Sequence, residues 1–242
     1  MKSDFNGDGK ADILWQNTSG SRALWLMNGT TFGSSIFLPS VATSWSIVGS
    51  GDFNGDGQAD ILWQNSSGAR AIWLMTGTVH TGSASLGTVA TSWNIVGAAD
   101  FNGDGQADIL WQNSSGARAI WLMNGTVHTG SVNLGTVATS WNIVGSGDFN
   151  GDGQADILWQ NSSGARAIWL MTGTVHTGSV NLGAVATSWN IVGAADFNGD
   201  GQMDILWQNS SGARAIWLMN GTTYSSSVYF GTAATSWNIR NY

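Results

Sequence analysis

Aspartate recurs along this chain in a pattern that could bind a hard cation. The pattern Asp-x-Asn-x-Asp-Gly-x-x-Asp places side-chain oxygens at alternating positions around a glycine, as in Asp52, Asn54, Asp56 and Asp60. Oxygen ligands spaced in this way wrap a cation of the size of calcium, and the backbone carbonyl of the seventh residue adds another ligand. The sequence therefore predicts a calcium site in each copy of the pattern.

The pattern occurs five times and accounts for all 15 acidic side chains of the chain. The predicted ligands are Asp4, Asn6, Asp8, Lys10, Asp12, Asp52, Asn54, Asp56, Gln58, Asp60, Asp100, Asn102, Asp104, Gln106, Asp108, Asp148, Asn150, Asp152, Gln154, Asp156, Asp196, Asn198, Asp200, Gln202 and Asp204. Five bound Ca²⁺ would change the formal charge from −7 to −7 + 10 = +3. The alternative is five Asx-rich turns without metal, although three unneutralised carboxylates in one short loop repel each other.

The flanks of the pattern indicate strands rather than helices. An EF-hand has a bidentate glutamate at the twelfth position, where this chain has Trp63 in the second copy. The chain contains no glutamate and 34 glycines, which disfavours helices. We therefore expect each aspartate loop to connect two strands of a β-hairpin.

The five copies define a tandem repeat. They begin at Asp4, Asp52, Asp100, Asp148 and Asp196, so the spacing is 48 residues each time. A fixed period of this length means that each unit buries its apolar face against its neighbours. Near-identity of the central units indicates recent amplification or deliberate symmetrisation.

The sequence of each unit predicts four short strands separated by turn residues. In one unit the expected strands are 93–100, 108–112, 117–123 and 127–134. The apolar runs do not alternate with polar residues, which is typical of sheets covered on both faces. Four strands per unit predict an all-β, five-bladed β-propeller forming a single domain over residues 1–242. A β-solenoid is the second possibility.

The ends of the chain suggest how the ring closes. The first unit begins at Met1, directly before its aspartate loop, and lacks a first strand. The segment 236–242 has the sequence of that strand without a loop after it. We expect this segment to complete the first blade and to remove an exposed sheet edge.

The motif Asp-Phe-Asn-Gly-Asp-Gly-Gln-Ala-Asp-Ile-Leu-Trp resembles the FG-GAP-like (VCBS-type) repeat, and the resemblance covers all five units. Similar calcium-loop blades occur in integrin α-chain propellers and in some propeller lectins. The resemblance implies a propeller with Ca²⁺ in the hairpin between the first two strands. It also implies secretion or surface display, although this chain shows no signal peptide. The chain has five units rather than the seven of integrins, and a fold of this kind does not fix a ligand.

Several function classes are poorly served by these residues. All carboxylates lie in the loops, and the histidines, His80, His128 and His176, share one repeat position with Phe32 and Tyr224. We expect these histidines to pack as aromatic residues, and we expect no enzyme. The eight basic residues are scattered along the chain, so we expect no nucleic-acid binding. The sequence has neither an amphipathic helix nor a run of about 18 apolar residues, so we expect no membrane insertion.

A surface for neutral, polar ligands is better supported. The second-to-third turn and the fourth-to-first link must lie on the rim opposite the aspartate loops. Tryptophan, amide and arginine side chains meet there, which is chemistry typical of sugar recognition. The candidate ligand-binding residues are Trp15, Gln16, Asn17, Arg22, Trp45, Trp63, Gln64, Asn65, Arg70, Trp93, Trp111, Gln112, Asn113, Arg118, Trp141, Trp159, Gln160, Asn161, Arg166, Trp189, Trp207, Gln208, Asn209, Arg214 and Trp237.

Each of these groups also has a structural interpretation. We call a tryptophan and its copies at the same repeat position a class. The Trp15 and Trp45 classes could belong to the core. The Trp25 class, which includes Trp73, is flanked by apolar residues and is assigned to the core. The arginines lie far from every carboxylate, so they must use backbone carbonyls, a tryptophan face or a ligand. The leading hypothesis is a calcium-stabilised, multivalent, carbohydrate-binding propeller with glycan partners. The alternative is an adhesion or protein-interaction scaffold, or a symmetrised design without a natural ligand, and the oligomeric state stays open.

Overall fold

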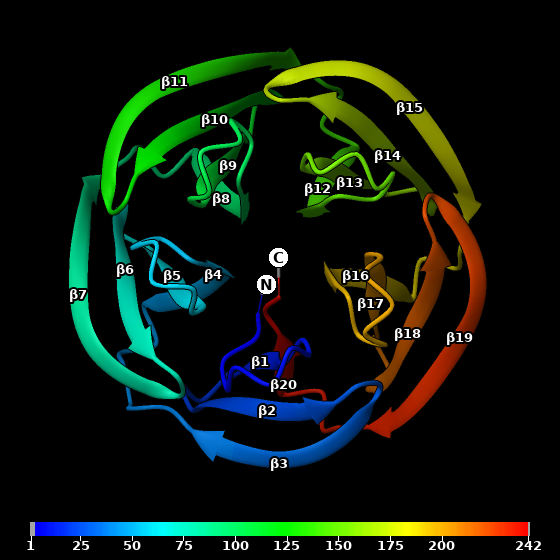
Figure 1. The fold of residues 1–242 in the computed structure, drawn as a ribbon, viewed down its shortest axis with the longest axis horizontal. Helices are drawn as coiled ribbons and strands as arrows, with labels where there is room; N and C mark the ends of the chain where they lie inside the picture. Colours follow the sequence, from blue (N-terminus) through cyan, green and yellow to red (C-terminus); the bar gives the residue numbers. More distant parts are fainter. Residues whose placement is uncertain (1–2, 242) are drawn as a thin grey trace.

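The structure is a computed structural model that describes residues 3–241, and these form 20 β-strands. The strands make five four-stranded sheets, each antiparallel, arranged as blades around a central axis (Figure 1). The predicted all-β, five-bladed propeller is therefore confirmed. Met1, Lys2 and Tyr242, which belong to the predicted domain, lie outside the described residues. No helix within 3–241 is long and apolar enough to cross a bilayer.

Each blade runs from an inner strand beside the axis to an outer strand at the circumference. Blade 1 contains β20 (Trp237–Ile239), β1 (Ile13–Asn17), β2 (Arg22–Asn28) and β3 (Thr31–Phe37). Blade 2 contains β4 (Trp45–Gly51), β5 (Asp60–Asn65), β6 (Ala69–Thr76) and β7 (Val79–Thr88). Blade 3 contains β8 (Trp93–Ala99), β9 (Asp108–Asn113), β10 (Ala117–Asn124) and β11 (Val127–Thr136). Blade 4 contains β12 (Trp141–Gly147), β13 (Asp156–Asn161), β14 (Ala165–Thr172) and β15 (Val175–Ala184). Blade 5 contains β16 (Trp189–Ala195), β17 (Asp204–Asn209), β18 (Ala213–Asn220) and β19 (Thr223–Thr232).

The C-terminal strand closes the ring, as the sequence predicted. β20 pairs antiparallel with β1, with Trp15 opposite Ile239 and Asn17 opposite Trp237. The side chain of Asn241 continues this pairing beyond the short strand. Its Oδ1 accepts a hydrogen bond of 2.6 Å from the Leu14 backbone N–H, and its Nδ2 donates one of 2.6 Å to the Asp12 carbonyl. The amide thus replaces backbone hydrogen bonds that a longer strand would make.

The core lies between blades, because both faces of each sheet are covered. Ile61 and Trp63 of β5 pack against Leu14 and Leu24 of blade 1. Leu62, the residue between them, packs on the other face against blade 3. Five such clusters of buried residues link the five blades into a ring. Each fully buried large apolar side chain contributes about 1.5–3 kcal/mol relative to exposure.

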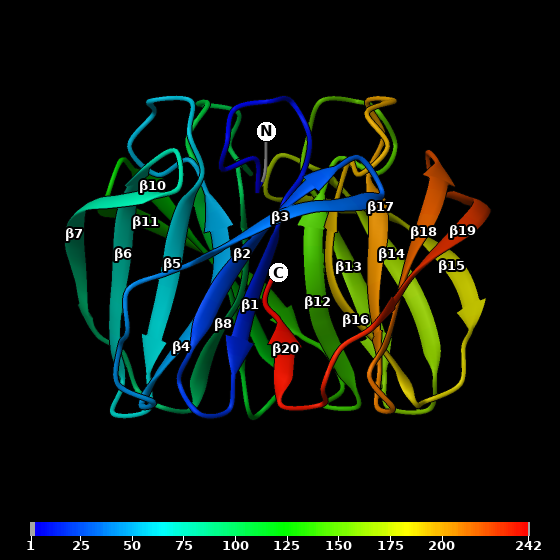
Figure 2. The same ribbon diagram turned by 90° about the horizontal axis from the view of Figure 1, so that it is seen from below.

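The propeller has two chemically different rims (Figure 2). We call the edge that carries the aspartate loops (4–12, 52–60, 100–108, 148–156 and 196–204) the loop rim. We call the opposite edge, which carries the second-to-third turns of the blades and the links between blades, the turn rim. Inner strands run toward the loop rim, and the second strands run away from it. This arrangement confirms the predicted separation of the aspartates from the arginine-bearing turns.

Candidate functional site

The aspartate loops are folded by their own side chains. In the second loop, the Asp52 carboxylate accepts backbone hydrogen bonds from Gly55 (2.7 Å) and Gly57 (2.8 Å). These glycines have φ of +75° and +82°, a region that favours residues without a Cβ. Asn54 donates a hydrogen bond of 2.9 Å from Nδ2 to Asp56 Oδ2. The Asn-Gly-Asp-Gly sequence therefore forms a compact turn on the loop rim with exposed oxygens.

The last aspartate of each loop is buried and holds two segments together. Asp60 is fully buried, and its two carboxylate oxygens accept backbone hydrogen bonds from Phe53 (3.0 Å) and Met75 (2.9 Å). Burial raises the pKa of Asp60 to about 6, against the lowering effect of these hydrogen bonds, and the charges of Asp56 and Asp52 raise it further. The same causes raise the pKa values of Asp12, Asp108 and Asp204 to about 6 and that of Asp156 in the same direction.

The donor chemistry of the loops fits a hard cation, because every candidate side-chain ligand except Lys10 offers an oxygen. Within residues 3–241, however, no three acidic or histidine side chains converge closely enough to hold a metal ion. The side chain of Gln58 is turned away, since its Oε1 accepts the Gly77 backbone N–H of the next hairpin. Lys10, at the same place in the first loop, bonds Asn28 instead. Calcium binding stays a prediction.

The arginines of the turn rim are buried structural residues. Arg70 is 1% exposed, donates a 2.7 Å hydrogen bond to the Trp93 carbonyl, and lies 5.4 Å from the ring centre of Trp111 in the next blade. The same stacking occurs at all five interfaces. Of the three partners expected for these side chains, the structure provides backbone carbonyls and a tryptophan face. Loss of solvation lowers the pKa of each guanidinium.

The structure also revises the expected placement of the tryptophans. Trp63 and its copies, Trp15, Trp111, Trp159 and Trp207, are each 1% exposed and therefore cannot present an open face to a ligand. Their rings are covered because the arginine of the preceding blade lies over them. Trp73, in the class that the sequence assigned to the core, is only half-buried and lies 4.7 Å from Trp63. Trp93, in the Trp45 class, is also half-buried.

The histidines behave as aromatic residues, as the sequence predicted. His80 stacks on Trp73 with ring centres 4.2 Å apart and an interplanar angle of 22°. His128 and His176 stack in the same way on Trp121 and Trp169. In the outer units, Phe32 and Tyr224 make edge contacts instead. Each half-buried tryptophan of the Trp25 class, such as Trp73, therefore contacts one aromatic residue of the outer strand.

A cavity of about 310 Å³ opens beside these tryptophans in blade 5. Its lining includes the half-buried Trp189 and Trp217, together with Ser227 and Tyr229 of the outer strand. Tyr229 is 61% exposed, and Val185 of the link from blade 4 closes one side. We call this cavity the inter-blade slot. The residues flanking it recur in the other units except at the Tyr229 position, which holds Phe37, Ser85, Asn133 and Asn181, and at the Val185 position, where the link from blade 5 to blade 1 has Ala233.

The predicted amides of the turn rim connect neighbouring blades or cap turns. Gln64 accepts the Ile95 backbone N–H at 2.9 Å and donates to Asn94 Oδ1 at 2.7 Å, so it joins blade 2 to blade 3. Asn65 accepts the Ser67 backbone N–H at 2.9 Å and therefore stabilises the second-to-third turn. Sequence reasoning placed these residues on the rim and expected repeated inter-blade or rim sites, with Trp189 and Trp207 among the candidates. It did not join them to Trp217, Ser227 and Tyr229, because the slot also uses the two outer strands of the blade.

Comparison with protein families gives two matches. The FG-GAP-like repeat model matches residues 4–63, 52–111, 100–159 and 148–207, and the FG-GAP repeat model matches residues 188–230. No curated protein sequence matches the chain. A solved structure of similar shape is the crystal structure of BBS1N in complex with ARL6DN, soaked with mercury. It is 11% identical, with a TM-score of 0.42 over 95% of this chain and 79% of that one.

Proposed function

The chain belongs to the FG-GAP-like repeat family, and from this premise we propose that it is a non-catalytic, multivalent binding propeller that captures glycans in the inter-blade slot of blade 5 and at the matching places of the other blades, together called the inter-blade slots. Propellers built of these repeats are typically interaction or adhesion scaffolds rather than enzymes. The observation that carries the glycan proposal is the slot itself, where two half-buried tryptophans meet exposed polar groups of the outer strand. We also propose an extracellular or cell-surface location, which is typical of the family.

The chemistry of the slot suits a sugar ring. The indole faces of Trp189 and Trp217 offer apolar surface for C–H groups, while Ser227 and the Tyr229 hydroxyl offer hydrogen bonds to sugar hydroxyls. The volume of about 310 Å³ is at the lower end of the range for small-ligand sites, which is about 300–1,000 Å³. A single sugar unit is therefore the appropriate occupant of one slot.

Variation at one position would make the slots unequal. The residue that matches Tyr229 is Phe37 in blade 1, Ser85 in blade 2, Asn133 in blade 3 and Asn181 in blade 4. Asn133 and Asn181 supply amino donors, since their Oδ1 atoms already accept the Gly135 and Gly183 backbone N–H at 2.8 Å, whereas phenylalanine supplies no polar group. We expect the slots of blades 3 and 4 to favour more polar ligands. Several weak sites on one ring would raise avidity for a repeated glycan.

We further propose that the aspartate loops hold calcium and stabilise this scaffold. The side chains of Asp52, Asn54, Asp56 and Asp60, with the Gln58 carbonyl, would form one site, and the other loops would use the matching residues. The ion would supply positive charge that offsets carboxylate repulsion and the cost of burying Asp60. Its role would be structural, because the loop rim lies opposite the turn rim.

A protein-interaction scaffold is the second candidate, and exposed apolar residues on the outer strands favour it. Val79, Val127 and Val175 are each 61% exposed, and Phe37 is 71% exposed. These residues lie on four different blades, so a protein partner that spans several blades could cover them. A protein partner would cover a large area and would not be displaced by a free monosaccharide.

A glycan array in calcium buffer tests the proposal. Binding to one glycan class, competed by the free monosaccharide at roughly millimolar concentration, is the expected result. Replacing Trp45, Trp93, Trp141, Trp189 and Trp237 by alanine should abolish it. The matched control replaces Val79, Val127 and Val175 by threonine, which changes exposed positions outside the slots. A blank array from folded, calcium-loaded protein would favour the protein scaffold instead.

A further inference from the structure

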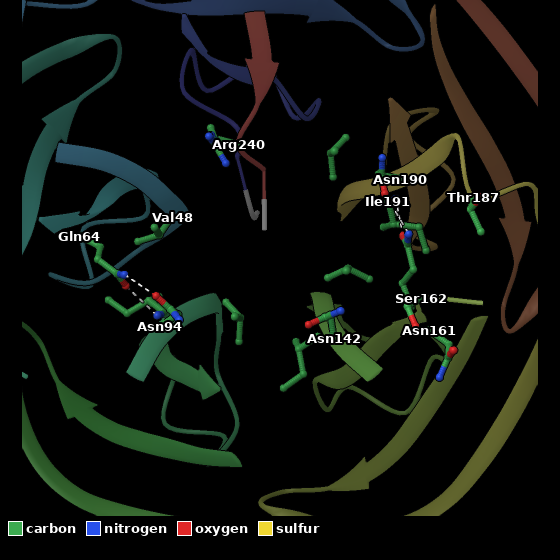
Figure 3. A pocket seen from close by; sticks show the side chains of 16 residues that line it. Val48, Gln64, Asn94, Asn142, Asn161, Ser162, Thr187, Asn190, Ile191 and Arg240 are labelled. Carbon is green, nitrogen blue, oxygen red and sulfur yellow. Dashed lines mark hydrogen bonds between the residues drawn. The ribbon is translucent and has the colours of Figure 1, made fainter. Parts of the chain in front are cut away.

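The turn-rim end of the central axis contains a second cavity, distinct from the slots. Its volume is about 530 Å³, and it is lined by inner-strand residues of several blades (Figure 3). Val48, Val144 and Val192 form apolar parts of the wall, while Asn142 and Asn190 add amides. This volume lies well inside the range of small-molecule sites, about 300–1,000 Å³. The cavity is therefore large enough for a ligand of sugar size.

One residue breaks the symmetry of this wall. Val48, Val96, Val144 and Val192 occupy the same repeat position, and the fifth copy of that position is Arg240. The Arg240 backbone N–H donates a 2.9 Å hydrogen bond to the Leu14 carbonyl, which fixes the residue beside β1. Its side chain lines the cavity. Blade 1, which β20 completes, thus places a guanidinium where the other four blades place valine.

Arg240 differs from the other described arginines in its partners. Those five donate to backbone carbonyls and stack on tryptophan. The Arg240 side chain makes no hydrogen bond or ion pair with any residue in the range 3–241. Its buried Nε–H is unpartnered there, as it is in the other five arginines, so the difference lies in the terminal Nη groups. The Nη donors of Arg240 therefore remain available to an acceptor bound in the cavity, with which they would form charged hydrogen bonds.

The neighbouring amides also present donors, and their orientation is fixed by the backbone. The Ile95 N–H can only donate, so the atom of Gln64 that receives it is Oε1. Gln64 Nε2 must then donate to Asn94 Oδ1, at 2.7 Å, which leaves the Asn94 amino group facing away from that bond. Gln112 with Asn142 and Gln160 with Asn190 repeat this chain at 2.8 Å and 3.1 Å.

The cavity therefore combines one guanidinium with three asparagine amino groups. Asn94, Asn142 and Asn190 are exposed, and within 3–241 their amino groups donate no hydrogen bond. Every side-chain carboxylate of the chain belongs to an aspartate loop, and none lines this cavity. The apolar wall lowers the local dielectric and strengthens charge attraction. An anionic ligand would meet donors from several blades and no acidic side chain among residues 3–241.

We propose that this axial cavity binds a sugar acid, with its carboxylate on the Arg240 guanidinium and its hydroxyls on the asparagine amides. Arginine recognises a carboxylate through two parallel N–H donors. Asn161, Ser162 and Thr187 line the same cavity and offer further polar groups to a ring rich in hydroxyls. This site is independent of the inter-blade slots, so either proposal can fail alone.

Calorimetric titration with glucuronate, glucose, acetate and inorganic phosphate tests the proposal. Glucuronate should bind, and glucose should bind at least about tenfold more weakly, because charged hydrogen bonds contribute roughly 1.5–3 kcal/mol. Raising the salt concentration should weaken glucuronate binding. Acetate or phosphate binding as tightly as glucuronate would overturn the assignment to a sugar acid and leave only an oxyanion site.

Two variants test the role of Arg240. Arg240→Val restores the residue of the other four blades and should fold, yet it should weaken glucuronate binding by about tenfold to a hundredfold. Arg240→Lys keeps the charge without the paired donors, so its glucuronate affinity should lie between that of the unmodified protein and that of Arg240→Val. Binding in the inter-blade slots should stay unchanged in both. Unchanged glucuronate affinity in folded Arg240→Val, checked by circular dichroism, would overturn the proposal.

Discussion

The guanidinium of Arg214 in the last blade lies 4.9 Å from the ring centre of Trp15 in the first. The corresponding pairs at the other four interfaces are 5.0 to 5.4 Å apart. The contact that closes the ring is therefore the same contact that joins consecutive blades. Closure depends on the repeat itself, and β20 adds the missing inner strand.

Arg214→Ala should destabilise the propeller by about 2–4 kcal/mol. It removes the hydrogen bond to the Trp237 carbonyl and the stacking on Trp15, and charged hydrogen bonds and cation–π contacts contribute about 1.5–3 and 0.5–2 kcal/mol. Denaturant unfolding measures the change. Arg118→Ala, at an internal interface, is the matched variant and should cost a similar amount. A negligible cost at Arg214 alone would show that the closing interface contributes little.

Asn241→Ala should loosen the closing edge of blade 1. The substitution removes the two buried hydrogen bonds of the Asn241 side chain, to the Leu14 N–H and the Asp12 carbonyl. The expected loss is about 2–6 kcal/mol, because two backbone groups would be buried without partners at about 1–3 kcal/mol each. Hydrogen exchange should show faster exchange at the Leu14 amide. Protection at Leu62, the equivalent residue of blade 2, serves as the control and should not change.

Chelation should lower the melting temperature if the aspartate loops hold calcium. A ligand that binds only the native state stabilises it by about 2.7 kcal/mol per site at a concentration 100 times its Kd. Asp56→Asn in the second loop should reduce the calcium-dependent part of the stability, with little effect in excess chelator. A melting curve that does not respond to EDTA would exclude calcium as a stabilising ion.

Trp63→Phe should cost clearly less stability than Trp63→Ala. The Trp63 indole N–H is buried and has no hydrogen-bond partner among residues 3–241, so phenylalanine sacrifices no hydrogen bond. Alanine would leave a cavity between blades 1 and 2 and should cost about 3–5 kcal/mol. Denaturant unfolding of the two variants and the unmodified protein measures both losses of stability. Equal losses would contradict the interpretation that Trp63 stabilises the interface mainly by filling it with a large aromatic ring.

Most of the fold was predictable because its information is repeated. The spacing of Asp4, Asp52 and their copies gave the number of blades, and the tail beginning at Ser236 indicated the closing strand. Local turn signals placed the strand ends within about two residues, which is the usual precision of such boundaries. Periodic patterns of this kind survive in the sequence because each blade needs the same internal contacts.

The burial of the predicted ligand residues was not predictable in the same way. Trp63 is covered by Arg22 of the preceding blade, and that contact depends on the rotation between blades rather than on local sequence. Trp73 is half-buried because its outer neighbour is a short aromatic residue, His80, instead of a further sheet. Arg240, in contrast, could be found by placing the inner strands in register, since valine stands at the matching places.

The Arg-over-Trp interface has a consequence for incomplete rings. Each blade carries the arginine on one face and the tryptophan on the other, so a contact of this kind is head-to-tail and grows until the rotation closes. A fragment of two or three blades would keep one unpaired face of each kind. Such fragments have complementary adhesive ends, and they would recruit further copies until a closed assembly forms.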